Sequence, residues 1–249
     1  MPESEVYRKF REEGFCGSCG GRPAEEGRAK CRFCLDRDAL YRAELRRDGI
    51  EPRASSKDLF LDPSRTRVGI LDIESSGLIG DFGVTFCVVI KIFGRDELKI
   101  FKMDIGPRDM LASEKKMLKE LVHYLRTLDG IVTYYGTGFD IPFLRTRMLS
   151  HGLTGYIRKL RHLDLYYTVR GKLLLSRNRL MNVIEMLKIA DGTVPDKGRV
   201  EPAKWMRVIF AGDKKAMQEV VDHCVEDVYA LEAALLRLQG VAPDRILRK

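Results

Sequence analysis

The feature that most constrains the fold is a short apolar run, Val68 to Glu74, that carries two acidic residues near its end. Its length and composition are typical of a buried central β-strand, in which almost every side chain is apolar. Asp72 and Glu74 are two residues apart, so both side chains project from the same face of such a strand. Buried carboxylates are costly unless they are paired or bound to metal. The alternative is that the strand ends before them and that both are solvated.

The segments after this run alternate between strand-like and helix-like patterns. Gly94 to Glu97 separates two apolar runs, which predicts a hairpin. Ser113 is a candidate N-cap for the helix that follows it. The expected strands are residues 68–74, 82–92, 98–103, 130–135 and 162–167, and the expected helices are residues 113–128, 142–151, 179–189 and 214–238. This order indicates an α/β fold in which helices cover a mixed sheet.

Two further acidic positions lie at places where active-site residues are common. Asp140 follows the glycine-containing turn Gly136–Gly138 and precedes a helix, so it lies at a strand-to-helix junction. It could equally serve only as the N-cap of that helix. In the last helix, His223 and Asp227 are four residues apart and share a face that borders the apolar stripe. The alternative is that His223 and Asp227 form a pair on the protein surface, which contributes little to stability.

The four carboxylates of Asp72, Glu74, Asp140 and Asp227 would repel one another strongly if they met in one pocket. Divalent cations would remove that repulsion, and oxygen ligands favour Mg²⁺ or Mn²⁺. Two such ions can clamp a phosphodiester and activate a water molecule.

Three other residues stand out in apolar surroundings. Trp205 is expected to be a core anchor or a base-stacking platform, and Cys87 and Cys224 are expected in the core.

Three segments resemble the motifs of the DEDD superfamily of 3′–5′ exonucleases, which have a ribonuclease H-like fold. They are Leu71–Leu78, Tyr134–Pro142 and His223–Val228. The second also resembles the version found in the proofreading domains of family B DNA polymerases. The whole set is most similar to a predicted ribonuclease H-like exonuclease family of bacteria and archaea, over residues 67–240. The resemblance implies a mixed five-stranded sheet flanked by helices.

By this resemblance, Asp72, Glu74, Asp140 and Asp227 would bind two Mg²⁺ or Mn²⁺ ions, and His223 would act as the general base. Tyr135 stands where the second motif usually has asparagine, and His223 stands where one version of the third motif has tyrosine. The expected reaction is hydrolysis of a terminal phosphodiester in single-stranded DNA or RNA, releasing nucleoside 5′-monophosphates. The competing predictions are a catalytically weak nucleic-acid-binding module and a structure-specific endonuclease on the same fold.

Four cysteines near the N-terminus form two C-x₂-C pairs, Cys16 with Cys19 and Cys31 with Cys34. This pattern predicts one structural Zn²⁺ bound by four thiolates, with disulfides as the alternative. We therefore expect a zinc ribbon-like module with a following helix at residues 1–47, a linker at residues 48–66 and the exonuclease domain at residues 67–249. The zinc module could strengthen binding to nucleic acid or bind a protein partner.

The net charge is +8, and the excess lies in one tract, residues 145–179, which hold nine Lys or Arg residues and one acidic residue. Such a tract favours phosphate binding, although a solvated basic face is the alternative. The expected nucleic-acid-binding residues are Arg145, Arg147, Arg158, Lys159, Arg161, Lys172, Arg177 and Arg179. No apolar run is long enough to span a membrane, and the first residues lack a secretory pattern, so we expect a cytoplasmic protein without a membrane partner.

Overall fold

The structure is a computed structural model, and it describes residues 14, 23–26, 31–32, 35–36, 63–64, 66–105, 109–153, 160–189 and 202–238. The chain divides into two compact units, Met1–Ala54 and Ser55–Lys249. Most of the first unit, including Cys16, Cys19 and Cys34, lies outside the described residues. So does most of the helix expected after these cysteines, and most of the expected linker.

The second unit is built on a single mixed sheet of five strands in the order β3-β2-β1-β4-β5. The strands are β1 (Val68–Ser75), β2 (Thr85–Ile92), β3 (Leu98–Lys102), β4 (Gly130–Thr133) and β5 (Arg161–Asp164). The β1–β2 and β2–β3 pairs are antiparallel, whereas β1–β4 and β4–β5 are parallel. This arrangement confirms the predicted sheet, and it follows from apolar strands such as β2, in which every residue is buried.

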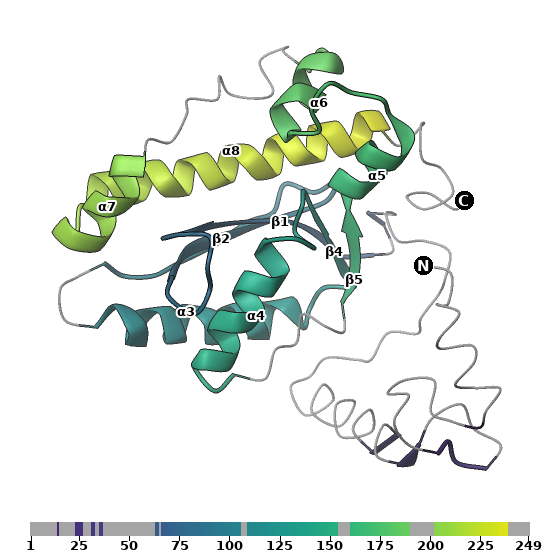
Figure 1. Cartoon of the computed structure of the whole chain (residues 1–249), viewed down its shortest axis with the longest axis horizontal. Helices are drawn as coiled ribbons and strands as arrows, with labels where there is room; N and C mark the ends of the chain where they lie inside the picture. The colour runs from purple at the N-terminus through teal and green to yellow at the C-terminus, as the bar shows by residue number, and fades with distance from the viewer. Residues whose placement is uncertain are drawn as a thin grey trace. The chain divides into compact units, whose positions relative to one another are not determined.

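Helices cover the sheet on both sides (Figure 1). They are α3 (Met110–Leu125), α4 (Asp140–Ser150), α5 (Leu165–Lys172), α6 (Leu180–Met186), α7 (Pro202–Ala211) and α8 (Lys214–Leu238). The long helix α8 packs over β1 and β2, whereas α3 and α4 lie on the opposite side of the sheet. The apolar stripe of α8, from Ala216 to Leu238, forms the core against these strands.

A buried ion pair also holds α8 to the sheet. Lys91 in β2 and Glu232 in α8 are both largely buried, and Lys91 Nζ lies 2.6 Å from Glu232 Oε2. The other carboxylate oxygen of Glu232 accepts a hydrogen bond from the backbone N–H of Gly94, at 2.9 Å. Because each charge is paired and bonded, burial of both is tolerated. These contacts fix the position of the helix that carries His223 and Asp227.

Several details of the expected elements were wrong, among them the cap of one helix and the end of one strand. Helix α3 begins at Met110, and its N-cap is Asp109, whose carboxylate accepts from Ala112 N, so Ser113 is not the cap. The Ser113 hydroxyl accepts instead from the backbone N–H of Asp104. The last strand ends at Asp164 because that side chain caps α5 by accepting from Tyr166 N, so residues 165–167 are helical.

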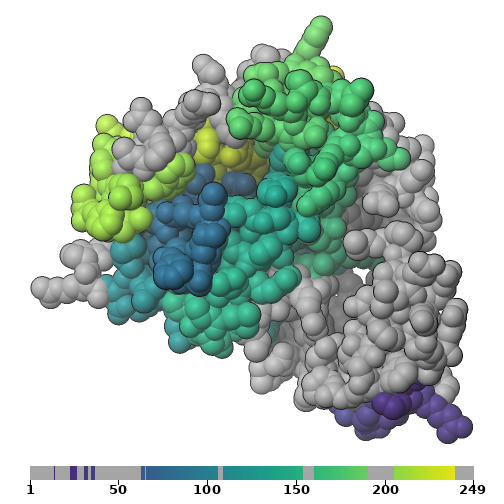
Figure 2. Space-filling view, viewed as in Figure 1, coloured from purple at the N-terminus to yellow at the C-terminus, as the bar shows by residue number. Residues whose placement is uncertain are grey.

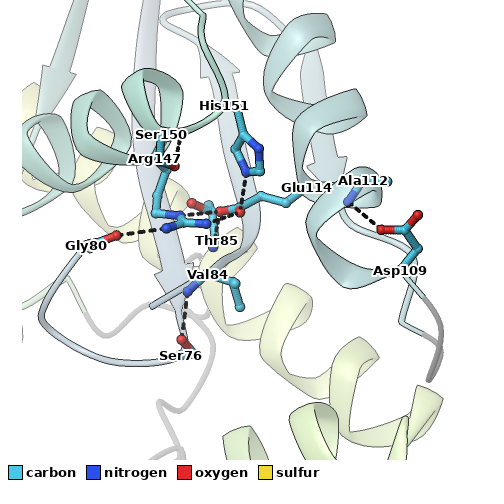
Figure 3. Close-up of polar contacts among 10 residues, drawn as sticks. All are labelled: Ser76, Gly80, Val84, Thr85, Asp109, Ala112, Glu114, Arg147, Ser150 and His151. Atoms are coloured by element: carbon cyan, nitrogen blue, oxygen red, sulfur yellow. Dashed lines mark hydrogen bonds and ion pairs between the residues drawn. The ribbon is translucent and has the colours of Figure 1, made fainter. Parts of the chain in front are cut away.

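Glu114 of α3 lies at the centre of a buried ionic cluster (Figure 3). Its carboxylate accepts from Arg147 Nε and Nη2 of α4 at 3.0 and 2.6 Å, and from the backbone N–H of Thr85 in β2 at 2.7 Å. His151 Nε2 lies 2.8 Å from Glu114 Oε2. Arg147 also donates to Gly80 O, in the loop that follows β1. The cluster therefore joins two helices, a strand and this loop.

Candidate active site

The C-terminal ends of the three parallel strands meet at one edge of the sheet. β1 ends at Ser75, β4 at Thr133 and β5 at Asp164, and their parallel pairing brings these ends side by side. In α/β sheets this edge is where ligands usually bind. Figure 2 shows the surfaces of the loop after β1, of α4, of α5 with α6, and of α7 meeting on one face of the molecule.

Asp72 lies within β1, and its carboxylate is surrounded by other acids. Burial raises the pKa of Asp72 well above its ordinary value, and the nearby carboxylates of Asp227, Asp140 and Glu74 raise it further. The Cys224 thiol of α8 donates to Asp72 Oδ2 at 3.2 Å and lowers this pKa in part. Cys224 can donate because burial and the neighbouring thiol of Cys87 raise its own pKa, so it stays protonated.

Asp140 is the first residue of α4, so it is not the N-cap, a position that Phe139 occupies without a side-chain bond. Its side chain is buried against β1. Burial, together with the carboxylates of Asp164 and Asp227, raises the pKa of Asp140 to about 7, although the backbone N–H groups of Asp140 and Ile73 oppose the shift. This carboxyl group is therefore close to half protonated at neutral pH when no cation is near.

His223 and Asp227 of α8 face the end of β1 across a short gap. His223 Nε2 lies 3.8 Å from Glu74 Oε1 and 3.7 Å from Asp227 Oδ2. One ligand atom from each of these three residues lies within 4.8 Å of the others, a spacing that can hold a metal ion. All three side chains are mostly buried, so His223 and Asp227 are not a pair on the solvated surface.

Trp205 of α7 contacts the same group of acids. Its indole N–H donates to Glu74 Oε2 at 3.2 Å, and its ring packs partly against the core. The bond fixes the orientation of the carboxylate that points toward His223. The sequence predicted Trp205 as a core anchor or a base-stacking platform but did not predict this contact, because α7 follows a long segment whose path the sequence does not define.

Asp164 organises the turn that precedes Asp140. Its carboxylate oxygens accept from the backbone N–H groups of Tyr135 and Thr137, each at 2.8 Å, in addition to capping α5. Tyr135 has a φ of 66°, in the left-handed region that few residues other than glycine adopt. These bonds compensate for the unusual backbone and hold the segment between β4 and α4 in place.

The structure brings together all five residues that the sequence singled out for chemistry, Asp72, Glu74, Asp140, His223 and Asp227. Four carboxylates and one imidazole are a donor set that suits hard divalent cations such as Mg²⁺ or Mn²⁺. The raised pKa values of Asp72 and Asp140 show that these acids lack a basic partner sufficient to offset burial and repulsion. The residues present therefore fit a divalent-cation site.

The basic residues do not form one uniform track. Arg145, Lys172, Arg177 and Arg179 are exposed, and Arg161 is half-buried. The prediction that Arg147 binds nucleic acid was wrong. Arg147 is buried and bonded to Glu114, so it cannot also reach a phosphate. Its spacing in the basic tract gave no sign of this, because its partner lies 33 residues away. Arg158 and Lys159 lie outside the described residues.

Comparisons with known proteins agree with this fold. Residues 70–238 match the family model described as the RNase_H superfamily. A DNA polymerase of Methanocaldococcus jannaschii is 28% identical over 114 residues, which cover 35% of this chain and 7% of that polymerase. The family B DNA polymerase of the hyperthermophilic archaeon Pyrobaculum calidifontis has a TM-score of 0.50 and 18% identity, covering 73% of this chain and 27% of that one. The chain thus matches only a small part of each polymerase.

Proposed function

The chain belongs to the RNase H superfamily, and from that premise we propose that it is a two-metal-ion 3′–5′ exonuclease of single-stranded nucleic acid. The products would be nucleoside 5′-monophosphates. The superfamily and the fold support nuclease activity in general. The observation that carries the finer proposal is the convergence of four carboxylates, from β1, α4 and α8, on the edge of the sheet where the parallel strands end.

In this proposal Asp72, Glu74, Asp140 and Asp227 hold two Mg²⁺ or Mn²⁺ ions. When bound, such ions polarise the scissile phosphodiester, lower the pKa of a bound water and stabilise the leaving oxygen. The chain's own contribution is to orient the ligands. Cys224 positions Asp72 by donating to Oδ2, and Trp205 positions Glu74 in the same way.

His223 is the proposed general base. Its Nε2 lies 3.8 Å from Glu74 Oε1 and 3.7 Å from Asp227 Oδ2, two of the proposed metal ligands, so a water molecule activated at that site would be within reach of the ring. The ring would accept the proton of the attacking water at Nε2. We expect His223→Ala to lower the rate roughly 10²–10⁴-fold, the usual scale for one acid–base group, while metal binding persists. An unchanged pH–rate profile in this variant would count against the assignment.

The substrate would be DNA or RNA, held through the exposed basic residues Arg145, Lys172, Arg177 and Arg179 of the second unit and the half-buried Arg161. The proposed zinc site remains a separate prediction. Of its four ligands, Cys16, Cys19, Cys31 and Cys34, only Cys31 lies among the described residues, where it is buried. Zinc analysis of the purified protein, with Cys31→Ser as the matched variant, would test it.

A cleavage assay distinguishes the three candidate activities. Matched single strands of DNA and RNA, with free or blocked 3′ ends, are incubated with Mg²⁺, Mn²⁺ or EDTA. An exonuclease of the proposed polarity releases mononucleotides only from unblocked strands and only with a divalent cation. Cleavage of blocked strands at internal positions would identify an endonuclease instead. Binding without cleavage under every condition would reject the proposed activity in favour of a binding module.

Among the described helices, none combines the length and apolar character needed to cross a bilayer.

A further inference from the structure

Four tyrosine rings gather beside the candidate active site, at the end of β4 and the start of α5. Tyr135 lies 4.9 Å from Tyr166 and 6.5 Å from Tyr167 between ring centroids, and Tyr166 lies 5.2 Å from Tyr167. Tyr134 contacts Tyr166 edge-on at 5.9 Å. Tyr134 and Tyr166 are half-buried, but Tyr135 and Tyr167 remain 46% and 47% exposed. Packing in the core does not account for the two exposed rings.

The ring of Tyr135 is held in a fixed position. Its backbone is left-handed, a conformation that is unfavourable for a residue with a large side chain and that is concentrated at functional sites. Asp164 fixes this backbone by accepting from Tyr135 N. The ring then lies over Gly138, where a Cβ atom would come within 2.5 Å of ring atoms, so a residue other than glycine would displace it.

This position places the rings next to the acids. Gly138, beneath the Tyr135 ring, is two residues before Asp140. Asp164, which bonds to Tyr135 and caps the helix that carries Tyr167, lies close enough to raise the pKa of Asp140. A nucleotide whose phosphodiester lay at the carboxylates could therefore bring one of its bases, or a neighbouring base, to these rings.

Cationic side chains flank the same rings. The Tyr134 hydroxyl donates to the backbone carbonyl of Asn178 at 2.8 Å, which joins the segment after α5 to the tyrosines. Arg177 and Arg179, on either side of Asn178, are exposed. Arg170 of α5 is exposed as well, three residues after Tyr167 and so on the same side of that helix. Stacking rings combined with cationic groups are the usual components of a site for single-stranded nucleic acid.

We propose that Tyr135 and Tyr167 form a base-stacking platform for single-stranded nucleic acid beside the catalytic acids, with Arg170, Arg177 and Arg179 pairing with the adjacent phosphates. This inference rests on the proposed function and specifies how its substrate is held. Stacking needs only the face of a base, so the platform accepts every base and favours strands whose bases are unpaired. It also gives a role to the tyrosine that stands where the second motif usually has asparagine.

The test measures binding without cleavage, in EDTA, by the fluorescence anisotropy of a labelled single-stranded oligonucleotide. Tyr135→Asn removes the ring and suits a left-handed backbone, because asparagine adopts that conformation readily. Tyr167→Ala removes the second ring. We expect each substitution to weaken binding about 5- to 150-fold, the range for loss of one base–aromatic stack. Tyr135→Phe keeps the ring and should recover most of the affinity.

An oligonucleotide that lacks bases separates stacking from folding effects. The wild-type protein and the two ring-deleted variants should bind this abasic strand equally, since no base is present to stack. Arg177→Ala should instead weaken binding to both the normal and the abasic strand. It should also reduce the slope of the logarithm of the binding constant against the logarithm of the salt concentration by about one. Leu174→Ala, which removes an exposed apolar side chain of the same segment, is the matched control and should bind as the wild type does.

The outcomes distinguish this inference from the proposed activity. If the wild-type protein cleaves single strands but both ring-deleted variants bind normal and abasic strands as it does, the platform is wrong and the activity stands. If the variants lose affinity for normal strands alone while no strand is ever cleaved, the platform stands and the proposed activity is wrong. A wild-type protein that binds no single strand, or variants that lose affinity for the abasic strand equally, would overturn the platform.

Discussion

Asp72 and Glu114 are both buried carboxylates of the same domain, yet their surroundings are opposite. Burial raises the pKa of both, but Glu114 is bonded by Arg147, His151 and the N–H of Thr85, and these bonds leave its pKa below its ordinary value. Among the described residues, Asp72 has three acids near it and accepts from the Cys224 thiol, so its pKa rises well above its ordinary value.

The contrast separates acids that hold the fold together from acids for which we propose a catalytic role. The Glu114 cluster is complete as it stands and fixes the loop after β1 through Arg147 and Gly80 (Figure 3). In the Asp72 group, burial and the neighbouring acids disfavour the ionised form of Asp72, which costs stability. Such a cost is typical of functional sites, where stability is exchanged for activity.

The sharpest test of the contrast is Asp72→Asn. The amide keeps the shape of the side chain but removes a metal ligand and one repelling charge. We expect cleavage to fall at least about 10³-fold, on the scale of losing one charge-stabilising group. The free energy of unfolding of the metal-free protein should stay constant or rise. Wild-type cleavage by this variant, measured with a blank of EDTA-treated enzyme, would contradict the proposed role of Asp72.

Glu114→Ala should have the opposite profile. It leaves the guanidinium of Arg147 buried without its partner, and we expect a loss of about 3–5 kcal/mol in the free energy of unfolding, measured with urea. Glu120→Ala, on the exposed side of the same helix, is the matched control and should change stability by no more than about 0.5 kcal/mol. If Glu114→Ala and Glu120→Ala lowered the free energy of unfolding equally, the structural role of the Glu114 cluster would be contradicted.

The two clusters should also respond to pH with opposite signs. Folding raises the pKa of Asp140 from 3.8 to about 7, so the folded state keeps a proton that the unfolded state has lost. The stability of the metal-free protein should therefore fall as pH rises from about 4 to about 7. Glu114 has a lowered pKa, so its contribution is present above its ordinary value of 4.5 and is lost as pH decreases below that value.

Urea unfolding in EDTA at several pH values checks this prediction. Asp140→Asn should reduce the decline between about pH 4 and 7, with the remainder due to Asp72, whose pKa is also raised, and it should not affect the loss at acid pH. Addition of Mg²⁺ should raise the stability of the wild-type protein more at pH 8 than at pH 5.5, because protons compete with the cation for the carboxylates. A decline that persists unchanged in Asp140→Asn would mean that other groups produce it.

The smallest predicted effect concerns Trp205. It is the only tryptophan of the chain, and its indole donates to Glu74, so a cation that binds Glu74 should change its fluorescence. Asp227→Asn keeps this reporter and should weaken the response. Trp205→Phe removes the indole N–H and should lower the affinity for Mn²⁺ about 10-fold, the usual effect of losing a residue that orients a metal ligand. Isothermal titration calorimetry with Mn²⁺ measures this affinity. Unchanged affinity would limit Trp205 to packing.

Much of the second unit could be predicted because its signals are local. The alternation of apolar runs and turns gave the strands, and the acids stood out because they interrupt such runs, as Asp72 and Glu74 do in β1. The partners of these acids were not predictable from local patterns. Cys224 meets Asp72 across 152 positions of sequence and Trp205 meets Glu74 across 131, and each contact depends on how a helix packs on the sheet.

The role of Arg147 was also not predictable from the local sequence. It lies in a basic tract, and charge density alone assigned it to phosphate binding. Its burial is decided by Glu114, an acid whose position on the buried side of α3 became visible only in the folded chain. Ser113 failed as a cap for a related reason, because Asp109 four residues earlier offered a carboxylate to the helix N-terminus.

The position of α8 in the order of synthesis has a consequence for the living cell. His223 and Asp227 lie on the last of the described helices, whereas Asp72 and Glu74 lie on the first described strand of the sheet. A polypeptide still emerging from the ribosome therefore carries only part of the proposed site until residues near 227 have left the exit tunnel and docked.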